Sequence, residues 1–323
     1  MSNGGVKNIL LIFNRLSRPQ KQFLSTFSGL VVLGLVFSIL SPYFFTLNNI
    51  LTVATQTAVI AIIAIGQTYV LITGGIDLSI GSNIALSAMV AGLCMRANMP
   101  VPVAILAGLL TGVCAGAVSG TLVAFGKLPP FIATLGTMTV VRGLSFTLTQ
   151  AVPISNLPKS FTIWGTGRTL GIPNPVIVML LLVVIFGFVL AKTKLGRHIY
   201  ATGSNFEAAR LSGVNTRKVL MTVYIFSGLL AAFAGLIMAA RIITAQPAAG
   251  DGYELDAVAS SVIGGTSTMG GEGSIAGTFV GAFVIGILRN GLNLINVTPY
   301  IQKIIIGIVI VGSVFLDKIR RKD

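Results

Sequence analysis

Acidic residues are scarce in this sequence, which limits the chemistry that the chain could perform. It has eight Asp and Glu residues against 22 Lys and Arg residues. Asp77 is the only acid among the first 206 residues, and it lies in the segment Gly74 to Ser82, GGIDLSIGS. The glycines allow a tight reversal there. The side chains of Asp77 and Ser79 could then bond free backbone N–H groups and cap the next helix. A role in transport or coupling is the alternative.

Motifs that would indicate an enzyme are missing. Gly271-x-Gly273-x-x-Ala276 matches the dinucleotide fingerprint in form, but that fingerprint requires a preceding strand and a βαβ unit, and here it lies between two apolar runs. The sequence has no G-x-x-x-x-G-K-[ST] phosphate loop, no H-E-x-x-H zinc motif and no G-x-S-x-G serine elbow. The single histidine, His198, has no His or Cys nearby to complete a zinc site. We therefore expect no catalytic residues, no metal ligands and no cofactor.

The elements that must position the polar groups are apolar runs. The chain is 54% hydrophobic and only 9% charged, whereas soluble domains carry about 25% charged residues. Because a membrane-spanning helix needs about 20 mostly apolar residues, we expect an all-α polytopic membrane protein with ten transmembrane helices. They are predicted at about 27–40, 53–73, 82–95, 101–125, 131–148, 175–191, 219–240, 256–265, 275–288 and 300–316. Residues 1–323 would form a single transmembrane domain.

The distribution of basic residues predicts the orientation. Ten spans put both termini on one side. With the termini in the cytoplasm, fifteen Lys and Arg residues lie on the cytoplasmic side and six on the other, in agreement with the positive-inside rule. Residues 1–26 would be a cytoplasmic N-terminal segment, with an interfacial helix around 9–13. The basic residues stand in short gaps beside lipid headgroups, which argues against nucleic-acid binding. Arg142 alone lies within a span, where it should contact backbone carbonyls or snorkel.

Residues 192–218 form the longest cytoplasmic connection, and its middle predicts a short helix from Asn205 to Val214. Asn205 can cap its N-terminus, and Gly213 suits its C-terminal end. Because so short a helix is unstable alone, it must dock on something. It is either the docking helix for a cytoplasmic partner or a plain surface loop. The segment consists of Asn205, Phe206, Glu207, Ala208, Ala209, Arg210, Leu211, Ser212, Gly213 and Val214.

Two further patterns concern the packing of the spans. Glycines at 108, 112, 116 and 120 recur every four residues, which predicts a tight helix interface. The segments 75–82 and 252–260 resemble each other, and each precedes a short run rich in small residues. In the ten-span arrangement they lie on opposite faces, as an inverted repeat predicts.

Residues 244–256 hold three acids, which could pair with an extracytoplasmic partner or be solvated.

Several segments, in order along nearly the whole chain, resemble the ribose-type permeases of ABC importers, the family that also serves xylose, galactose, arabinose and autoinducer-2. They are Gly74 to Ser82, Phe131 to Leu135 with Arg142-Gly143, Leu195-Gly196-Arg197 with Glu207 to Gly213 (EAARLSG), Ala245-Gln246-Pro247, Gly252 to Asp256 (GYELD), Gly264 to Gly273, and Asn290 to Leu294. The resemblance implies a permease of the bacterial inner membrane with a homodimeric or pseudo-dimeric core, in which a second copy of this chain is the expected partner. Cytoplasmic ATPase subunits would bind the dimer, and a periplasmic sugar-binding protein would deliver the substrate. Residues 192–218 would then hold the coupling helix.

The expected function is ATP-driven import of a monosaccharide, most closely ribose. An ion-coupled secondary transporter, or a permease of the same family for another sugar or autoinducer-2, is the alternative. A path for a neutral polyol needs scattered hydroxyls and amides. The candidates are Gln67, Thr68, Asp77, Ser79, Ser87, Gln246 and Asn293.

Overall fold

The computed structural model describes residues 18–320, so the predicted helix around residues 9–13 lies outside the described residues. Each of the ten predicted apolar runs is a helix. These helices are α2 (Arg18–Leu40), α3 (Leu47–Ile72), α4 (Ile80–Arg96), α5 (Val101–Ala124), α6 (Pro130–Thr147), α8 (Asn174–Lys192), α11 (Thr216–Ile242), α12 (Tyr253–Ile263), α13 (Ile275–Leu294) and α14 (Pro299–Arg320). Within the described residues, six helices are long and apolar enough to cross a membrane: α2, α3, α5, α8, α11 and α13.

Local sequence sets the starts of several helices. Thr46 caps α3 by accepting the N–H of Asn49 through its hydroxyl, and Ser274 caps α13 by accepting the N–H of Gly277. A proline stands in the first turn of α5, α6 and α8, where its missing N–H costs no helical hydrogen bond. In these five helices a side-chain cap or a proline thus marks the first turn.

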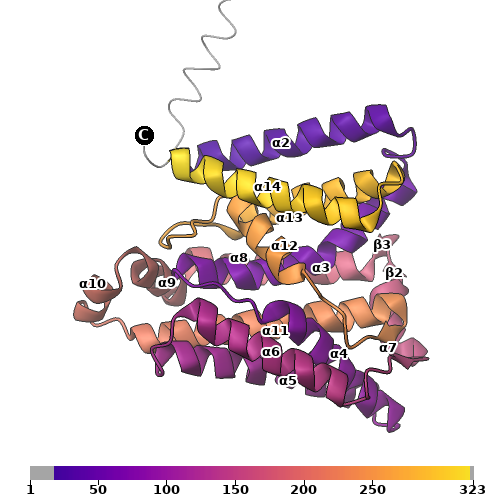
Figure 1. Ribbon diagram of the computed structural model, residues 1–323, viewed down its shortest axis with the longest axis horizontal. Helices are drawn as coiled ribbons and strands as arrows, with labels where there is room; N and C mark the ends of the chain where they lie inside the picture. Colours follow the sequence, from indigo (N-terminus) through magenta and orange to yellow (C-terminus); the bar gives the residue numbers. More distant parts are fainter. Residues whose placement is uncertain (1–17, 321–323) are drawn as a thin grey trace, which may run out of the picture.

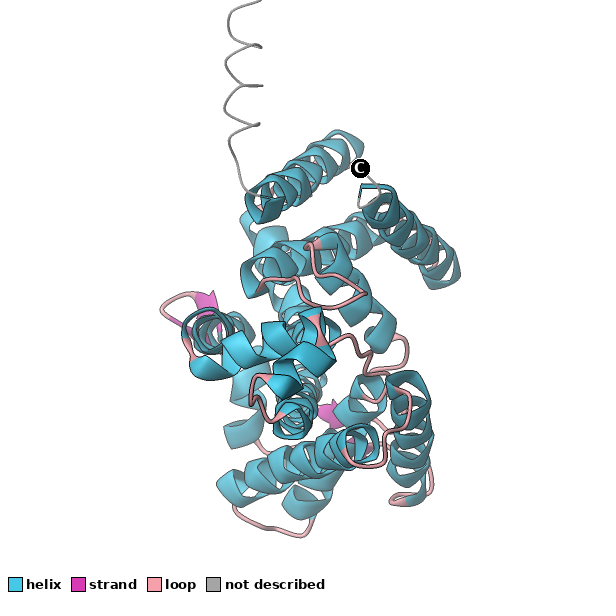
Figure 2. Ribbon diagram, turned by 90° about the vertical axis from the view of Figure 1, so that its left-hand side faces the viewer, coloured by secondary structure: helices cyan, strands magenta, loops and turns pink. Residues whose placement is uncertain are grey.

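Short elements that the apolar runs do not predict lie at the two ends of the bundle (Figure 1). Helices α9 (Lys194–Ser204) and α10 (Phe206–Leu211) lie at one end, here called the α10 end. Helix α7 (Lys159–Thr166) and the hairpin of β2 (Arg168–Thr169) and β3 (Ile172–Pro173) lie at the other, the α7 end. In addition, β1 (Ile154–Ser155) pairs antiparallel with β4 (Thr244–Ala245). The first turn of α2 and the last turn of α14 lie at the α10 end. Figure 2 views this end with many of the helices nearly end-on.

The core is built on α3 and α11, which pack against each other. The C-terminal half of α3 is continuously buried, with only backbone and side chains of its own chain around it. The predicted glycine interface is confirmed, because α5 packs along α11 through it. A Cβ atom at Gly112 would lie 2.4 Å from the carbonyl oxygen of Gly228, and one at Gly116 would lie 2.3 Å from that of Tyr224. Only glycine permits this backbone contact.

The packing of the first long helices recurs among the later ones. Helix α11 packs on α4 and α5, and α3 packs on α12 and α13. Helix α4 packs on α5 and α6, and α12 packs on α13 and α14. Exchanging α3, α4, α5 and α6 for α11, α12, α13 and α14 therefore reproduces the same set of neighbours. In both sets, an irregular segment separates a long helix from a short one.

Candidate functional site

The predicted short helix at the α10 end is confirmed, and its caps are local. Asn205 accepts the backbone N–H of Ala208 through its side-chain oxygen at 2.9 Å. At the other end, Gly213 has φ +85°, in the left-handed region that favours glycine, and its N–H donates to the Arg210 carbonyl at 3.1 Å. The N–H of Val214 donates to the Ala209 carbonyl at 3.0 Å. These bonds close the six-residue helix Phe206–Leu211 at both ends.

This helix buries only one small side chain against its own chain. Ala209 is buried, whereas Phe206 is 42% exposed and Leu211 is 78% exposed. Glu207 and Arg210 form an exposed ion pair at 2.8 Å. An exposed apolar pair on a capped helix is typical of a docking surface. We call Phe206, Glu207, Arg210 and Leu211 the α10 surface.

A groove of about 690 Å³ separates α10 from the turn between α5 and α6 and from the start of α11. Phe206, Glu207 and Arg210 form one wall, and Lys127 and Arg217 lie on the others. The groove gives the α10 surface access from the side as well as from the end of the bundle. Basic side chains around it would attract acidic groups of a partner.

The neighbouring helix α9 was not predicted from the sequence, and it fixes α10 to the bundle. The Tyr200 hydroxyl donates to the Gly273 carbonyl at 2.7 Å. Burial raises the pKa of Tyr200, so the hydroxyl stays a neutral donor. Gly203 lies so close to Ile72 that a Cβ atom would meet its carbonyl oxygen at 1.7 Å. The same carbonyl accepts the N–H of Gly271 at 2.8 Å. The end of α3 and the glycine-rich loop 264–274 therefore both hold α9.

Asp77 lies fully buried in the irregular segment 73–79 between α3 and α4. One carboxylate oxygen accepts the backbone N–H of Ser79 at 2.9 Å and its hydroxyl at 2.6 Å, and the other accepts the Ser227 hydroxyl at 2.6 Å. With its amide oriented to satisfy both groups, Gln67 bonds the backbone N–H and carbonyl of Asp77. The prediction that Ser79 caps α4 with its side chain is wrong, because its hydroxyl donates to Asp77 instead.

The other buried pathway candidates form two polar clusters between helices. Thr68 donates to the Ala64 carbonyl at 2.8 Å and lies 2.6 Å from Thr278 and 3.0 Å from Ser261, oxygen to oxygen. In the second cluster, Ser87 donates to Asn83 at 3.2 Å. The Asn83 amide donates to two carbonyls, those of Gly112 and Gly228. These clusters join α3, α12 and α13 in the first case and α4, α5 and α11 in the second.

The seven pathway candidates therefore do not come together at one site. Gln67, Thr68, Asp77, Ser79 and Ser87 are buried and hydrogen-bonded within the chain. Gln246 and Asn293 are exposed, and Asn293 accepts a bond from Gln302 at 2.7 Å. In this conformation Gln246 and Asn293 lie at the surface of the chain, whereas the other five are bonded within it.

The segment between α11 and α12 turns inward to meet the start of α4. A Cβ atom at Gly250 would lie 2.4 Å from the Gly81 carbonyl oxygen. Arg142 holds the segment by donating to the carbonyls of Pro247 at 3.1 Å and Ala249 at 2.8 Å. The expectation that this arginine contacts backbone carbonyls is therefore confirmed. Irregular backbone at membrane depth is tolerated where it is enclosed by protein or lines a cavity. This close contact between Gly250 and Gly81 was not predicted, although the sequence has a glycine at both positions.

The three acids of residues 244–256 differ in their surroundings. Asp251 is exposed and lies 3.8 Å from Lys303, oxygen to nitrogen. Asp256 is buried and forms an ion pair with Arg289, whose guanidinium also lies 5.4 Å from the centre of the Tyr253 ring. The expectation that these acids are solvated or free for an extracytoplasmic partner is thus wrong for Asp256. Within the described residues, no group of three or more His, Cys, Asp or Glu could hold a metal ion.

Comparison with known proteins gives a consistent result along the chain. The family described as branched-chain amino acid transport system / permease component matches residues 49–314. The ribose import permease protein RbsC of Escherichia coli (strain K12) is 46% identical over 293 residues, 90% of this chain and 91% of that protein. RbsC of Bacillus subtilis (strain 168) is 47% identical over 300 residues, 92% and 93% of the two chains.

A transport protein for another sugar is also similar. The D-allose transport system permease protein AlsC of Escherichia coli (strain K12) is 38% identical over 299 residues, 92% of each chain. No solved structure matches the chain.

Proposed function

The chain belongs to the family described as branched-chain amino acid transport system / permease component, and from this membership we propose that it is the permease subunit of an ABC importer for ribose. Such a subunit is a multi-pass protein of the inner membrane and a transport component, and ATP hydrolysis is the work of a separate subunit. The ribose import permeases, 46% and 47% identical over at least 90% of this chain, support ribose as the substrate.

The observation that carries the mechanism is the α10 surface. A capped helix presents Phe206 and Leu211 to water at the α10 end, which is the arrangement that a partner with a matching cleft requires. The sequence has no phosphate-binding loop of its own. We therefore assign Asn205 to Val214 as the coupling helix of the connection 192–218, and an ATPase subunit as its partner. A substrate-binding protein would dock at the α7 end.

The test is reconstitution of the permease with its ATPase and binding-protein partners in proteoliposomes. Labelled ribose should accumulate when ATP is supplied and should not accumulate with a non-hydrolysable ATP analogue. A protonophore should leave the ATP-driven uptake unchanged. Uptake that needs an ion gradient and no ATP would refute the importer, and preference for allose or another sugar would refute ribose alone.

Ten spans with an inverted repeat remain our proposal for the membrane topology. The helices α3, α4, α5 and α6 can be exchanged for α11, α12, α13 and α14 without changing which helices pack together, and this supports the repeat. The two polar clusters support it as well. Asn83 of α4 bonds α5 and α11, while Ser261 of α12 bonds α3, where Thr68 contacts both Ser261 and Thr278 of α13. Residues 1–323 would form one transmembrane domain.

Cytoplasmic placement of both termini, with residues 1–26 in the cytoplasm, rests on the charge bias. It is supported by the α2 and α14 ends lying at the same end of the bundle as α9 and α10 (Figure 1). The partners would include a second copy of the chain and membrane lipid. The sugar path would pass Gln246, Asn293 and the segment that Arg142 holds, while Gln67, Thr68, Asp77, Ser79 and Ser87 fix its walls.

A further inference from the structure

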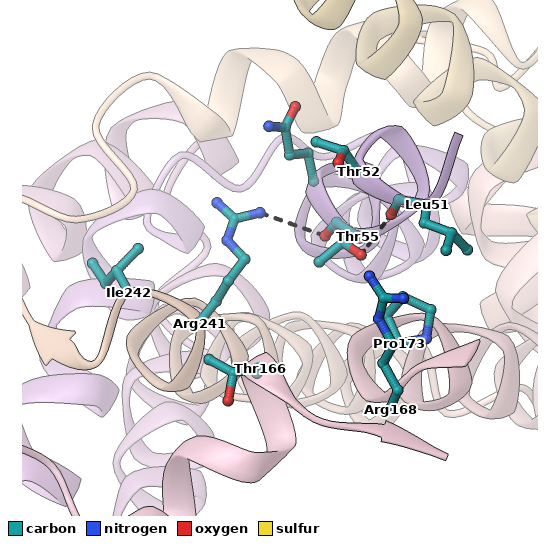
Figure 3. Close-up of a pocket in the computed structure, with 10 residues that line it drawn as sticks. Leu51, Thr52, Thr55, Thr166, Arg168, Pro173, Arg241 and Ile242 are labelled. Carbon is teal, nitrogen blue, oxygen red and sulfur yellow. Dashed lines mark hydrogen bonds between the residues drawn. The ribbon is translucent and has the colours of Figure 1, made fainter. Parts of the chain in front are cut away.

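Two arginines at the α7 end share one pocket of about 410 Å³. Arg241 comes from the last turn of α11, and Arg168 comes from β2. Figure 3 shows both side chains directed toward the part of α3 that carries Leu51 and Thr55. Among the described residues, the one hydrogen bond from either guanidinium is long, 3.5 Å from Arg241 to the Thr55 carbonyl oxygen. The pocket is therefore lined by two cations with most of their donors free of acceptors among the described residues.

No acid among the described residues forms an ion pair with either arginine. Of the other four basic residues assigned to this side of the membrane, Arg289 and Lys303 have Asp256 and Asp251 as partners, whereas Arg96 and Lys159 have no ion pair among the described residues. Positive charge on the outer side also runs against the positive-inside bias. Two like charges that line one pocket repel each other, less strongly where water and salt screen them, and an anion between them would remove the repulsion. The pocket is thus complementary to an oxyanion, to which arginine can donate two parallel hydrogen bonds.

The remaining walls identify the kind of oxyanion. Gln56 supplies an amide. Thr52, Thr55 and Thr166 also line the pocket, but their hydroxyls donate to the carbonyls of Asn48, Leu51 and Thr162. Leu51 and Ile242 line the same pocket with apolar surface. Outside it, Trp164 of α7 is 49% exposed and lies next to the lining residue Gly165. Tryptophan is enriched at the depth of lipid headgroups. A wall that is polar on one part and apolar on another suits the phosphate and glycerol of a lipid better than a fully hydrated ion.

We propose that this pocket binds the phosphate of a glycerophospholipid in the outer leaflet of the membrane. The two guanidiniums hold the phosphodiester oxygens, the Gln56 amide donates to a remaining oxygen, and Leu51 and Ile242 contact the glycerol and the start of the acyl chains. The bound lipid would join α3, α11 and the β2–β3 hairpin at the α7 end. This proposal does not depend on the transported sugar.

The test is lipid binding to the full chain, purified in a non-ionic detergent and stripped of native lipid. Dihexanoyl phosphatidylglycerol is titrated, and native mass spectrometry measures the adduct of one lipid per chain. Arg168→Gln and Arg241→Gln should each weaken this adduct roughly tenfold, the loss expected for one charge-assisted contact. Arg96→Gln is the matched control, because Arg96 is an exposed arginine at the same end that does not line the pocket. Equal elution profiles in size-exclusion chromatography would establish that each variant is folded.

Two ligand controls separate the phosphate from its possible sources. Dihexanoyl glycerol, which has the same chains without phosphate, should not bind at the site. Inorganic phosphate at the same concentration should not displace the lipid. Unchanged lipid binding in both arginine variants would overturn the proposal, as would displacement by inorganic phosphate. Unchanged lipid binding with a lost response to the binding protein would instead identify a protein-docking site. Because the readout is binding alone, these results leave the proposed transport function untouched.

Discussion

Leu211 of the α10 surface offers the sharpest test of coupling, because it is exposed in the free chain and should be covered in the complex. Its side chain is 78% exposed. Complete burial of a leucine contributes about 1.5–3 kcal/mol, so burial of the exposed part contributes about 1–2 kcal/mol to association. Leu211→Ser should therefore weaken binding of the ATPase subunit roughly 5- to 30-fold. The stability of the permease alone should hardly change, since the serine replaces a side chain that is already in water.

The assay is equilibrium binding of the purified ATPase subunit to the permease in nanodiscs, measured by biolayer interferometry. Leu170→Ser is the matched control, because Leu170 is 97% exposed in the β2–β3 turn at the opposite end. That variant should bind the ATPase with the wild-type affinity. The reasoning is refuted if Leu211→Ser binds as tightly as the wild type, or if Leu170→Ser weakens binding equally.

Three further changes test the local structure. Asn205→Ala removes the cap of α10 and should cost about 1 kcal/mol of its local stability, seen as faster amide hydrogen exchange over α10; Asn205→Asp, which keeps an acceptor, should exchange like the wild type. Gly112→Val places a Cβ atom 2.4 Å from the Gly228 carbonyl oxygen and should lower the thermal unfolding midpoint in detergent. Gly136→Val is the control, because no atom lies within 4 Å of the added Cβ, and it should keep the wild-type midpoint. Equal midpoints in the two variants would contradict the close contact. Asp77→Ala leaves three buried donors of Ser79 and Ser227 unpaired, at about 1–3 kcal/mol each, and should lower the unfolding midpoint. Asp251→Ala, at an exposed position, should keep the wild-type midpoint. Equal midpoints would mean that these buried hydrogen bonds do not stabilise the bundle.

The ten main helices could be predicted because each is a continuous apolar run. Helix α10 could be predicted because its N-terminal cap, Asn205, and the glycine that ends it, Gly213, lie within nine residues of each other. Helix α9 was not predicted, because its sequence is polar and basic. Its position depends on contacts of Tyr200 with Gly273 and of Gly203 with Ile72, which are far away in the sequence. Ser79 was assigned wrongly for a related reason. Sequence spacing fits a cap, but the side chain has a better acceptor in Asp77, which Ser227 of a distant helix helps to fix.

The pathway candidates show a more general limit. Hydroxyls and amides within apolar helices could serve either a sugar path or the contacts between helices, and the residue type is the same in both cases. For Thr68 the structure gives helix contacts, because its oxygen already has partners on α3, α12 and α13. Ser87 bonds Asn83 of its own helix, and the Asn83 amide makes the contacts with α5 and α11. The partner of a buried hydroxyl depends on which helices become neighbours, and a single sequence does not state this.

The contacts of α9 indicate how movement at α10 would reach the middle of the membrane. Tyr200 and Gly203 join α9 to the loop 264–274 and to the end of α3. That loop directly follows α12, a helix of 11 residues. The other end of α12 begins beside Gly250, whose backbone meets Gly81 at the start of α4. Every step in this series is a backbone contact or a hydrogen bond to backbone, with little freedom to absorb a displacement in side chains. A partner that shifts α10 would therefore move α12 with it, and the contact between Gly250 and Gly81 is where the two halves of the chain would part.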